Sequence, residues 1–496
     1  MEHVEQTVKS VIATKQTDMF AEMLREEVKF SDTRRKSDMD ETLQVLAERA
    51  MAGTQTQASN VFDRIRTMIA DIDARLSSQV NEIIHHPEFQ SMERAWRGLH
   101  YLVANTQSDE HLKIKVFNAS KAELNKALAK YSGDAFVEGT IFKKIYLEEF
   151  AQLGGHPYSC IIGDYYFDHS AQDVETLREM SSVAAAAHAP FIAAAAPSVL
   201  RMNSWQEIGN PSSIRGAFTG VEYTAWRSLR EKEDSRYLGL TMPRFLVRAP
   251  YGSKGKPVEG FAFEEEIPNG RHEYFCWANA AYAMGTNITR SFKKHGWISQ
   301  IRGSKSGGLI ENLPAYTYET DDGRLDLKCP TEAVIHDLRE PELAESGFMA
   351  LVHEKHTDQA VFLGAQSLQK PAVYDDPAAT ANANLAARLP YLFATCRFAH
   401  YLKALVRDHV GSFTTSVALK EWLERWINNY VDGDPANSTD EVKARKPLAE
   451  ARVSVADVPG NPGYYTAEFH LRPHYQLEGL TAALKLVAEM RGDKGK

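Results

Sequence analysis

Cysteine is scarce in this chain, and its distribution excludes two classes of site. The 496 residues contain four cysteines, Cys160, Cys276, Cys329 and Cys396, which are far apart and lie mostly in apolar runs. The close pairs of a zinc site and the dense pattern of a disulfide framework are both missing. We therefore expect free, buried thiols in a reducing compartment.

Long apolar runs are missing as well. The most apolar stretch, SSVAAAAHAPFIAAAAPSVL, is mostly alanine and is interrupted by His188, Pro190 and Pro197. It is too broken to cross a bilayer, so no membrane insertion is expected. The N-terminal segment MEHVEQTVKSVIATKQTD is polar and lacks the apolar centre of a signal peptide. Together these absences predict a cytoplasmic protein.

An excess of positive charge is the third missing feature. Lys and Arg number 57 against 66 Asp and Glu, which gives a formal charge of −9. A binder of duplex nucleic acid needs a strong basic surface, so no nucleic-acid partner is expected. A hydrophobic content of 43% and a charged content of 25% are ordinary for a globular protein. At this length, two or three subdomains are expected.

The apolar pattern predicts an α/β fold. From Val61 to Ile84 apolar residues recur at steps of three and four, which predicts a long amphipathic helix. Pro87 fits the first turn of a second helix, whose apolar face would carry Phe89, Met92, Trp96, Leu99 and Val103. Short apolar runs then alternate with helical segments. These runs are KIKVF, YSCIIGDYYF, PFIAAAA, FLVRAP and FMALVHEKHTDQAVFLGAQ.

Composition suggests three regions. Residues 1–60 are polar with short helical runs and predict an N-terminal helical arm that depends on a partner for order. Residues 61–378 form the central α/β region, with an outer helical subdomain at its start. Residues 379–496 begin with a long helical region, continue through the polar linker VDGDPANSTDEVKARKP, and end in a hairpin (448–472) and a terminal helix.

The hairpin is the clearest local pattern. Two arms with strict apolar/polar alternation flank the turn sequence PGNPG. A two-stranded hairpin is only marginally stable alone, and its free edges offer backbone groups to further strands. We therefore predict inter-subunit strand pairing here. The residues assigned to it are Ala451, Val453, Val455, Tyr465, Ala467, Phe469 and Leu471.

Motifs with possible chemistry are weak. RGSKSGG, residues 302–308, lacks the Lys-Ser/Thr pair of a phosphate loop, and His353 and His356 fall one residue short of a zincin pair. Asp164 ends an apolar run, where α/β enzymes often hold catalytic groups, but no nucleophile or second acid lies near it in sequence. We therefore predict no catalytic residue, no metal site and no cofactor, and interpret Asp164 as structural.

Other polar and aromatic residues have structural interpretations. His85 and His86 precede a helix entrance, where a local structural role is expected, and the glutamates 264–266 are interpreted as a solvated run. Large aromatic side chains on apolar stripes are expected in the core. They are Trp96, Trp226, Trp277, Trp297 and Tyr391.

Several long segments resemble the large subunit of the bacterial type VI secretion contractile sheath, the TssC/VipB/EvpB family. The C-terminal segment LAEARVSV…VPGNPGYY…LRPHYQLEGLT is similar to the end of that subunit. The resemblance is collinear from about residue 80 onwards, and residues 1–60 match more loosely. Further matching segments are HHPEFQSMERAWRGLHYL, PYSCIIGDYYF, EDSRYLGLTMPRFLVRAPYG, WANAAYAMGTNITRSFKKHGWISQIRG, LKCPTEAVIHDLREPELAESGF and LPYLFATCRFAHYLKALVRDHVGSF.

The resemblance implies a structural role and a set of partners. Expected partners are a small sheath subunit as heterodimer, further copies of this chain in a helical sheath, an inner tube of hexameric rings, a baseplate, and an AAA+ unfoldase that recycles the sheath. It implies a multi-subdomain, phage-tail-sheath-like α/β fold. The family resemblance and the amphipathic pattern together place the terminal helix against the inner tube, with Lys485, Glu489 and Arg491 facing it.

Three functional classes remain to be compared. The first is a structural subunit of a contractile sheath. The second is an α/β enzyme whose catalytic residues the sequence does not reveal, and the third is a scaffold or adaptor that uses the hairpin for strand addition. The whole-length resemblance and the lack of a convincing catalytic set favour the first class.

Overall fold

The structure is a computed structural model that describes most of the chain between residues 58 and 476. Residues outside the description are 1–57, 210–213, 254, 260, 320–322, 324, 337, 410–414, 460–464 and 477–496. The chain divides into two compact units, of which the first comprises Met1–Ser91 with Pro250–Tyr274, and the second Met92–Ala249 with Phe275–Lys496. Among the described helices, none combines the length and apolarity needed to span a bilayer.

The first unit is built on the long helix α3, Ala58–Ile84, as the apolar periodicity predicts. Near its C-terminal end, the Asn81 side chain donates to the Glu264 carbonyl at 3.2 Å and accepts from the Glu266 amide at 3.0 Å. His85 Nε2 lies 3.3 Å from Glu265 Oε1. The Glu265 residue is only 8% exposed, so the prediction of a solvated acidic run is wrong for it. His85 has a structural role, through a contact distant in sequence.

Part of the apolar surface of α3 is well exposed in the described structure. Ile69, Ile72, Leu76 and Ile83 are 44%, 46%, 42% and 57% exposed. Positions separated by three and seven residues lie on one helix face, so these side chains form one strip along α3. A strip of this kind in a single chain indicates a surface that another element covers.

The second unit contains a six-stranded sheet in the order β1-β2-β3-β9-β10-β6. Its first four strands run parallel, and β10 and β6 add antiparallel at one edge. All residues of β2 and β3 are buried, as expected for parallel strands covered on both faces. The strands are β1 Ile161–Phe167, β2 Phe191–Ala195, β3 Leu238–Met242, β9 Phe348–His353, β10 Ala360–Phe362 and β6 Leu309–Ile310.

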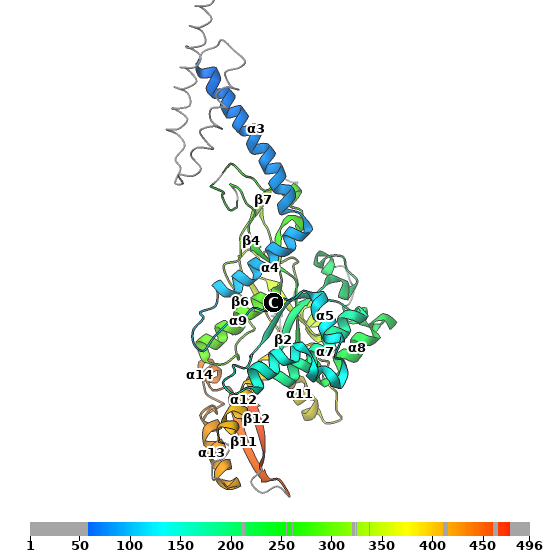
Figure 1. Ribbon diagram of the computed structural model, residues 1–496, viewed down its shortest axis with the longest axis vertical. Helices are drawn as coiled ribbons and strands as arrows, with labels where there is room; N and C mark the ends of the chain where they lie inside the picture. The colour runs from blue at the N-terminus through cyan, green and yellow to red at the C-terminus, as the bar shows by residue number, and fades with distance from the viewer. Residues whose placement is uncertain are drawn as a thin grey trace, which may run out of the picture. The chain divides into compact units, whose positions relative to one another are not determined.

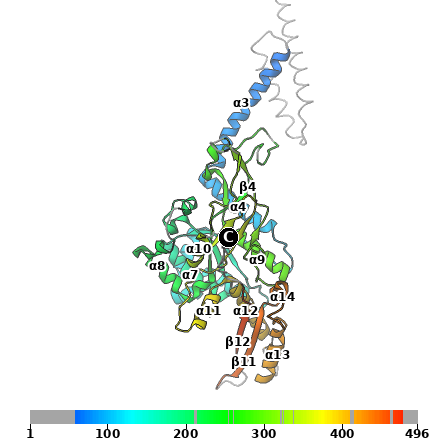
Figure 2. The same cartoon turned by 180° about the vertical axis from the view of Figure 1, so that it is seen from behind.

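Helices cover the two faces of this sheet. Helix α9, Ala280–His295, packs on β1, β2 and β3, while α7, Ala171–Ala187, packs on β2 and β3. The two views show α9 on one side of the sheet and α7 with α8, Thr224–Glu231, on the other (Figures 1 and 2). This arrangement confirms the predicted α/β core.

Shorter elements complete the described chain. The other helices are α4 Pro87–Ala104, α5 Lys121–Ala129, α6 Thr140–Phe142, α10 Arg339–Glu345, α11 Pro377–Ala386, α12 Leu389–Asp408, α13 Ser416–Asn428 and α14 Asp440–Arg445, with a π-helix at Lys143–Ala151. Two small antiparallel sheets pair β4 Phe245–Arg248 with β5 Cys276–Ala278, and β7 Thr317–Glu319 with β8 Leu325–Leu327.

Helix α4 buries a different face from the predicted one. Gly98 is buried because the ring of Tyr282 on α9 occupies the space that a Cβ would fill. Leu102, one turn further on, is 5% exposed, whereas Trp96 is 68% exposed. The prediction of a core role for Trp96 is therefore wrong. The side of α4 that packs on α9 therefore carries Gly98, which admits the Tyr282 ring, and Leu102.

Two further expectations need correction. The run KIKVF, residues 113–117, forms no strand, and its Val116 and Phe117 are 68% and 59% exposed. The four thiols are free, but Cys160 and Cys329 are only partly buried, whereas Cys276 and Cys396 are fully buried. The other aromatic side chains predicted for the core are buried, namely Trp226, Trp277, Trp297 and Tyr391.

A buried ion pair holds α4 to β4 within the second unit. Arg248 Nε donates to Glu93 Oε1 at 2.7 Å, and the two side chains are 3% and 11% exposed. Arg97, 30% exposed, donates to the same oxygen at 2.6 Å. Burial would raise the pKa of Glu93, but the two guanidinium groups outweigh it and lower the pKa.

Removing the buried partner should be costly. We expect Arg248→Met to reduce the free energy of unfolding by about 3–5 kcal/mol, because Glu93 stays buried after losing its least exposed partner. The matched control Arg97→Met removes a more exposed cation from the same carboxylate and should cost about 1 kcal/mol or less. Denaturant unfolding of both variants measures the difference, and equal losses would contradict the assignment. Because the folded pKa of Glu93 is lowered, the pair stabilises above the ordinary Glu range, and its contribution should fade as the pH drops through the folded pKa.

Candidate inter-subunit site

The predicted hairpin is present, and it is made of β11, Leu448–Asp457, and β12, Tyr465–Pro473. The strands are antiparallel, with Val453 opposite Phe469 and Ala451 opposite Leu471. Along β12 the residues alternate strictly between half-buried and exposed. The alternation read from the sequence therefore describes the real faces of the hairpin. Most of the PGNPG turn lies outside the described residues.

The apolar face of the hairpin packs against its own chain. Helix α13 lies along β11 in both views (Figures 1 and 2). Trp297 stacks on Phe398 with ring centroids 4.5 Å apart, which places α12 against the segment that follows α9. We call the buried residues of this cluster the hairpin core. They are Trp297, Phe398, Leu402, Leu423, Ile427, Leu448 and Val453.

The base of the hairpin is held by hydrogen bonds from distant segments. The Asp432 amide donates to the Leu448 carbonyl at 2.9 Å, where β11 begins. Beyond β12, the backbone N–H of Gln476 donates to the Tyr391 hydroxyl at 2.9 Å. The side-chain Nε2 of Gln476 donates to the Ser299 carbonyl at 2.7 Å. These contacts fix the start of β11 and the residues just beyond β12 to other segments of the second unit. Sequence reasoning missed them, because nothing local marks Tyr391, Ser299 or Asp432 as partners of the hairpin.

The outer edges of the hairpin carry no further strand within the described chain. Its sheet contains only β11 and β12, and β11 makes one additional bridge, from Leu448 to Val431 at the base. The backbone groups on the outer edge of β11 after Leu448, and on the outer edge of β12 from Thr466 to Leu471, have no described backbone partner outside the hairpin. Such edges are templates for strands of another chain.

The solvent face between these edges is charged and internally paired. Glu450 lies 2.7 Å from Arg452 and 3.2 Å from Arg472, and all three side chains are at least one-third exposed. Exposed pairs of this kind contribute little to stability. Their charges do discourage unspecific strand pairing at an open sheet.

The structure places the predicted strand-pairing residues on the covered face. Val453 is buried, and the remaining six residues are half-buried. Ala451, Val455, Ala467, Phe469 and Leu471 pack on the hairpin core. An incoming strand would therefore meet the backbone edges and not this apolar face. The predicted tube-facing residues Lys485, Glu489 and Arg491 lie outside the described residues.

The candidate catalytic residues are used structurally. Asp164 lies inside β1 and not at a turn, and it interacts with Tyr282 and Asn279 at the start of α9. Burial raises the pKa of Asp164, and the hydrogen bonds from those two residues only partly oppose this. The arrangement braces α9 against β1.

The remaining motifs form neither a phosphate loop nor a metal site in the described chain. In the loop 302–308, Arg290 donates to the Gly307 carbonyl at 3.0 Å, so a peptide oxygen of the loop already binds a cation of the same chain. His353 ends β9, and His356 follows in a turn with φ of 64°. No group of three or more His, Cys, Asp or Glu residues that could bind a metal is present in the described chain.

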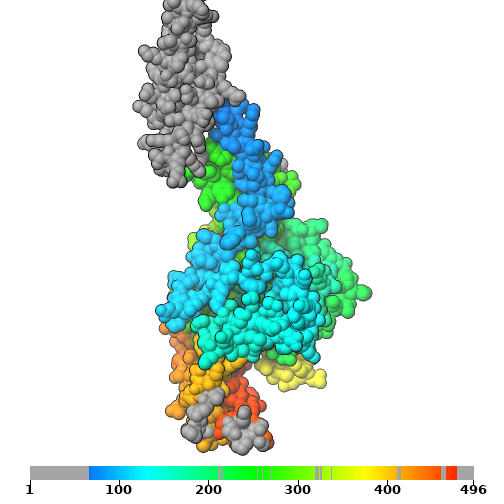
Figure 3. Space-filling view, in the orientation of Figure 1, coloured from blue at the N-terminus to red at the C-terminus, as the bar shows by residue number. Residues whose placement is uncertain are grey.

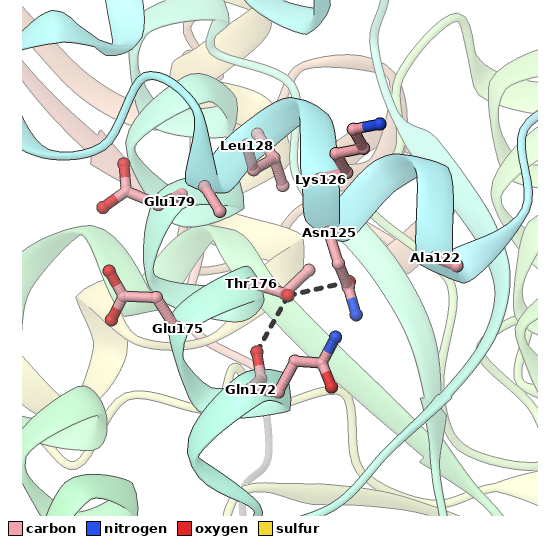
Figure 4. A pocket seen from close by; sticks show the side chains of 9 residues that line it. Ala122, Asn125, Lys126, Leu128, Gln172, Glu175, Thr176 and Glu179 are labelled. Carbon is pink, nitrogen blue, oxygen red and sulfur yellow. Dashed lines mark hydrogen bonds between the residues drawn. The ribbon is translucent and has the colours of Figure 1, made fainter.

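A hollow between α5 and α7 does not have the character of a ligand site. Its volume is about 380 Å³. The segment that contains α5 forms part of the cyan surface in Figure 3. Thr176 Oγ1 lies 2.8 Å from Asn125 Oδ1 and 2.9 Å from the Gln172 carbonyl oxygen, so its one hydroxyl hydrogen has two acceptors within reach. Figure 4 shows the Thr176, Asn125 and Gln172 groups turned toward one another, while the Glu175 carboxylate points away from them. Polar groups that satisfy each other leave little to orient a ligand.

The hairpin core generates a stability prediction. Leu423 is fully buried, whereas Val417 on the same helix is 65% exposed. We expect Leu423→Ala to cost about 2–5 kcal/mol and to speed amide hydrogen exchange in β11 and β12. Val417→Ala, the matched control, should change stability by less than about 0.5 kcal/mol. If both variants leave exchange in the hairpin unchanged, α13 does not support it.

Comparison with known proteins agrees with this architecture. Residues 66–369 match the model for the EvpB/VC_A0108 tail sheath N-terminal domain, and residues 378–490 match its tail sheath gpW/gp25-like domain. The type VI secretion system sheath protein TssC1 of Pseudomonas aeruginosa is 58% identical over 481 residues, which is 97% of each chain.

Chains of two solved assemblies are distantly similar to this one. A chain of the anti-feeding prophage baseplate matches with a TM-score of 0.37 and 10% identity, over 77% of this chain and 84% of that one. A chain of the contracted anti-feeding prophage sheath matches with a TM-score of 0.29 and 11% identity, over 63% and 66%. The sequence matches show that the chain belongs to the EvpB/VC_A0108 tail sheath family and is the large structural subunit of a type VI secretion contractile sheath.

Proposed function

We propose that this chain pairs with a small sheath subunit and that the heterodimers polymerise into a helical tube around an inner tube of hexameric rings. Head-to-tail contacts that do not close produce filaments, which is the geometry that a sheath requires. Contraction of this tube would propel the inner tube for effector delivery. The observation that carries the proposal is a hairpin with a filled core, a fixed base and open outer edges.

The small subunit would cover apolar surface that this chain leaves exposed. The strip of Ile69, Ile72, Leu76 and Ile83 on α3 supports this part of the proposal. In the same cycle, a baseplate would start assembly and an AAA+ unfoldase would recycle the contracted sheath. The bacterial cytoplasm is the proposed compartment.

Strand exchange at the hairpin would link neighbouring subunits by main-chain hydrogen bonds. Such links tolerate rigid-body motion when the connecting segments flex. The segment VDGDPANSTDEVKARKP before β11, expected from its composition to be a flexible linker, contains α14 and is tied to β11 through the Asp432 amide, so this flexibility would have to come from other segments. Contraction would then move subunits from a strained extended lattice to a more stable compact one without separating them.

The hairpin proposal predicts a defect in tubes but not in heterodimers. Val453→Pro or Phe469→Pro removes a backbone donor and clashes with the ladder. We expect the purified complex with the small subunit to form, while electron microscopy shows no tubes. Val453→Ala and Phe469→Ala, which keep the backbone N–H, are the matched controls and should retain tubes. Tubes of normal length from a Pro variant would refute strand linkage, and so would loss of the heterodimer itself.

A separate prediction concerns the C-terminal helix that the sequence pattern indicates. The sequence predicts a helix in which Leu477, Leu480, Leu484 and Val487 share one face and Lys485 and Glu489 lie on another. We propose that these two charges, together with Arg491 near the end of the chain, meet the inner tube. Reversing each of these three charges should reduce tube-bound sheath in co-sedimentation while heterodimers persist, because complementary charges fix such contacts. Lys126→Glu, an exposed position on α5, is the control. Wild-type levels of tube-bound sheath in all three variants would place the helix elsewhere.

The proposed role is mechanical and not catalytic. Energy stored during assembly would drive contraction, so neither assembly nor contraction needs nucleotide or metal bound to this chain. We expect purified sheath to show no ATP hydrolysis. Activity that scales with sheath concentration and disappears in Asp164→Ala or His353→Ala would establish an enzyme instead.

A further inference from the structure

A cysteine and a histidine meet at the C-terminal end of β9. His353 is the last residue of β9, and Cys329 lies in the segment that crosses next to β4. The Leu246 amide donates to the Pro330 carbonyl at 2.8 Å, which fixes that segment beside β4. Cys329 Sγ lies 3.2 Å from Thr331 Oγ1 and makes a hydrogen bond with His353. Backbone pairing on both sides therefore holds the thiol and the imidazole in place.

A third group orients the imidazole. His353 Nε2 lies 3.0 Å from the Thr357 carbonyl oxygen in the turn after β9. A carbonyl can only accept a hydrogen bond, so Nε2 carries the hydrogen and, in the neutral ring, Nδ1 is the basic nitrogen. Thiol, imidazole and carbonyl thus form a chain in which the base is oriented by a fixed acceptor. This is the arrangement that activates nucleophilic thiols.

The environments of the four thiols differ in a way that matches this geometry. Burial raises the pKa of Cys160, Cys276 and Cys396 to about 12 each, so these thiols stay neutral. Burial would raise the pKa of Cys329 too, but hydrogen bonds from His353 and Thr331 outweigh it and lower the pKa. Burial would lower the pKa of His353, and its bonds to Cys329 and Thr357 raise it instead. The two opposite shifts favour a thiolate beside an imidazolium.

We propose that Cys329 is a reactive thiol that undergoes exchange with small disulfides, with His353 as the residue that positions and activates it. Cys329 and His353 are both partly exposed, so the pair lies close enough to the surface for a small disulfide to approach it. The site is separate from the hairpin and from its core. A mixed disulfide here would add a polar group beside β9 in the large subunit of the sheath.

The chemistry is a balanced thiol–disulfide exchange. His353 takes the proton of Cys329, and the thiolate attacks one sulfur of the small disulfide. A new bond joins Cys329 Sγ to that sulfur while the original disulfide bond breaks. The departing thiolate leaves with the electron pair and takes up a proton, so one thiol is released for each mixed disulfide formed. Cys329 is oxidised and the departing half of the reagent is reduced.

The test measures modification of each cysteine in the folded, full-length chain. Oxidised glutathione is the reagent, and peptide mass spectrometry follows all four cysteines as a function of pH. We expect Cys329 to be modified while Cys160, Cys276 and Cys396 stay unmodified. Its rate should rise with an apparent pKa below the ordinary thiol value of about 8.5. A midpoint at or above that value in the wild-type chain overturns the proposal without any variant.

The His353→Gln variant tests the activating role. Glutamine keeps a donor for the Thr357 carbonyl but cannot take the thiol proton. We expect modification of Cys329 at neutral pH to slow by about tenfold or more and its pH midpoint to move upward. His356→Gln, in the exposed turn nearby, is the matched control and should leave the profile unchanged. An unchanged profile in His353→Gln, with the other three thiols still protected as a check on folding, would remove His353 from the proposal.

Discussion

The contact between the apolar face of the hairpin and α13 is the constraint on which the C-terminal part of the chain depends. Two strands alone bury too little surface to remain ordered in water. By packing on α13 and on the ring of Trp297, the hairpin becomes part of the second unit without using its backbone edges. The same contact explains how a strand pair can be stable in one subunit and still be open to strands of another.

Hydrogen bonds at the base of the hairpin fix the orientation of its two strands within the second unit. Gln476 is tied to Tyr391 at the start of α12 and to Ser299, and Asp432 is tied to Leu448. The open edges therefore hold a set position relative to α12 and the segment after α9. If neighbouring subunits pair with these edges, as we propose, the fixed base would present them at the repeated angle that a helical assembly requires.

Burial acts on the ionisable groups of the second unit in two ways. Where a partner of opposite charge is close, as for Glu93 beside Arg248 and Arg97, the charged form is retained despite desolvation. Where partners are neutral, as for Asp164 beside Tyr282 and Asn279, the pKa rises. Cys329 belongs to the first group, because His353 can supply the positive charge. At the three other thiols burial is the largest effect and raises the pKa, even where charged groups are near.

Local periodicity was enough to predict the long helix from Val61 and the two faces of the hairpin, because a repeat of 3.6 or 2 residues is a property of neighbouring positions. The whole-length sequence pattern was also enough to identify the family. Local periodicity missed β3, although that strand lies inside the sheet. Its five residues, LGLTM, contain Gly239 and Thr241 and show little apolar alternation. Periodicity also placed Trp96 in the core, whereas the buried side of α4 is the one that carries Gly98 against Tyr282 and Leu102. The anchoring of Gln476 and the pairing of Cys329 with His353 depended on the fold alone, because contacts between residues distant in sequence exist only once strands and helices have been brought together.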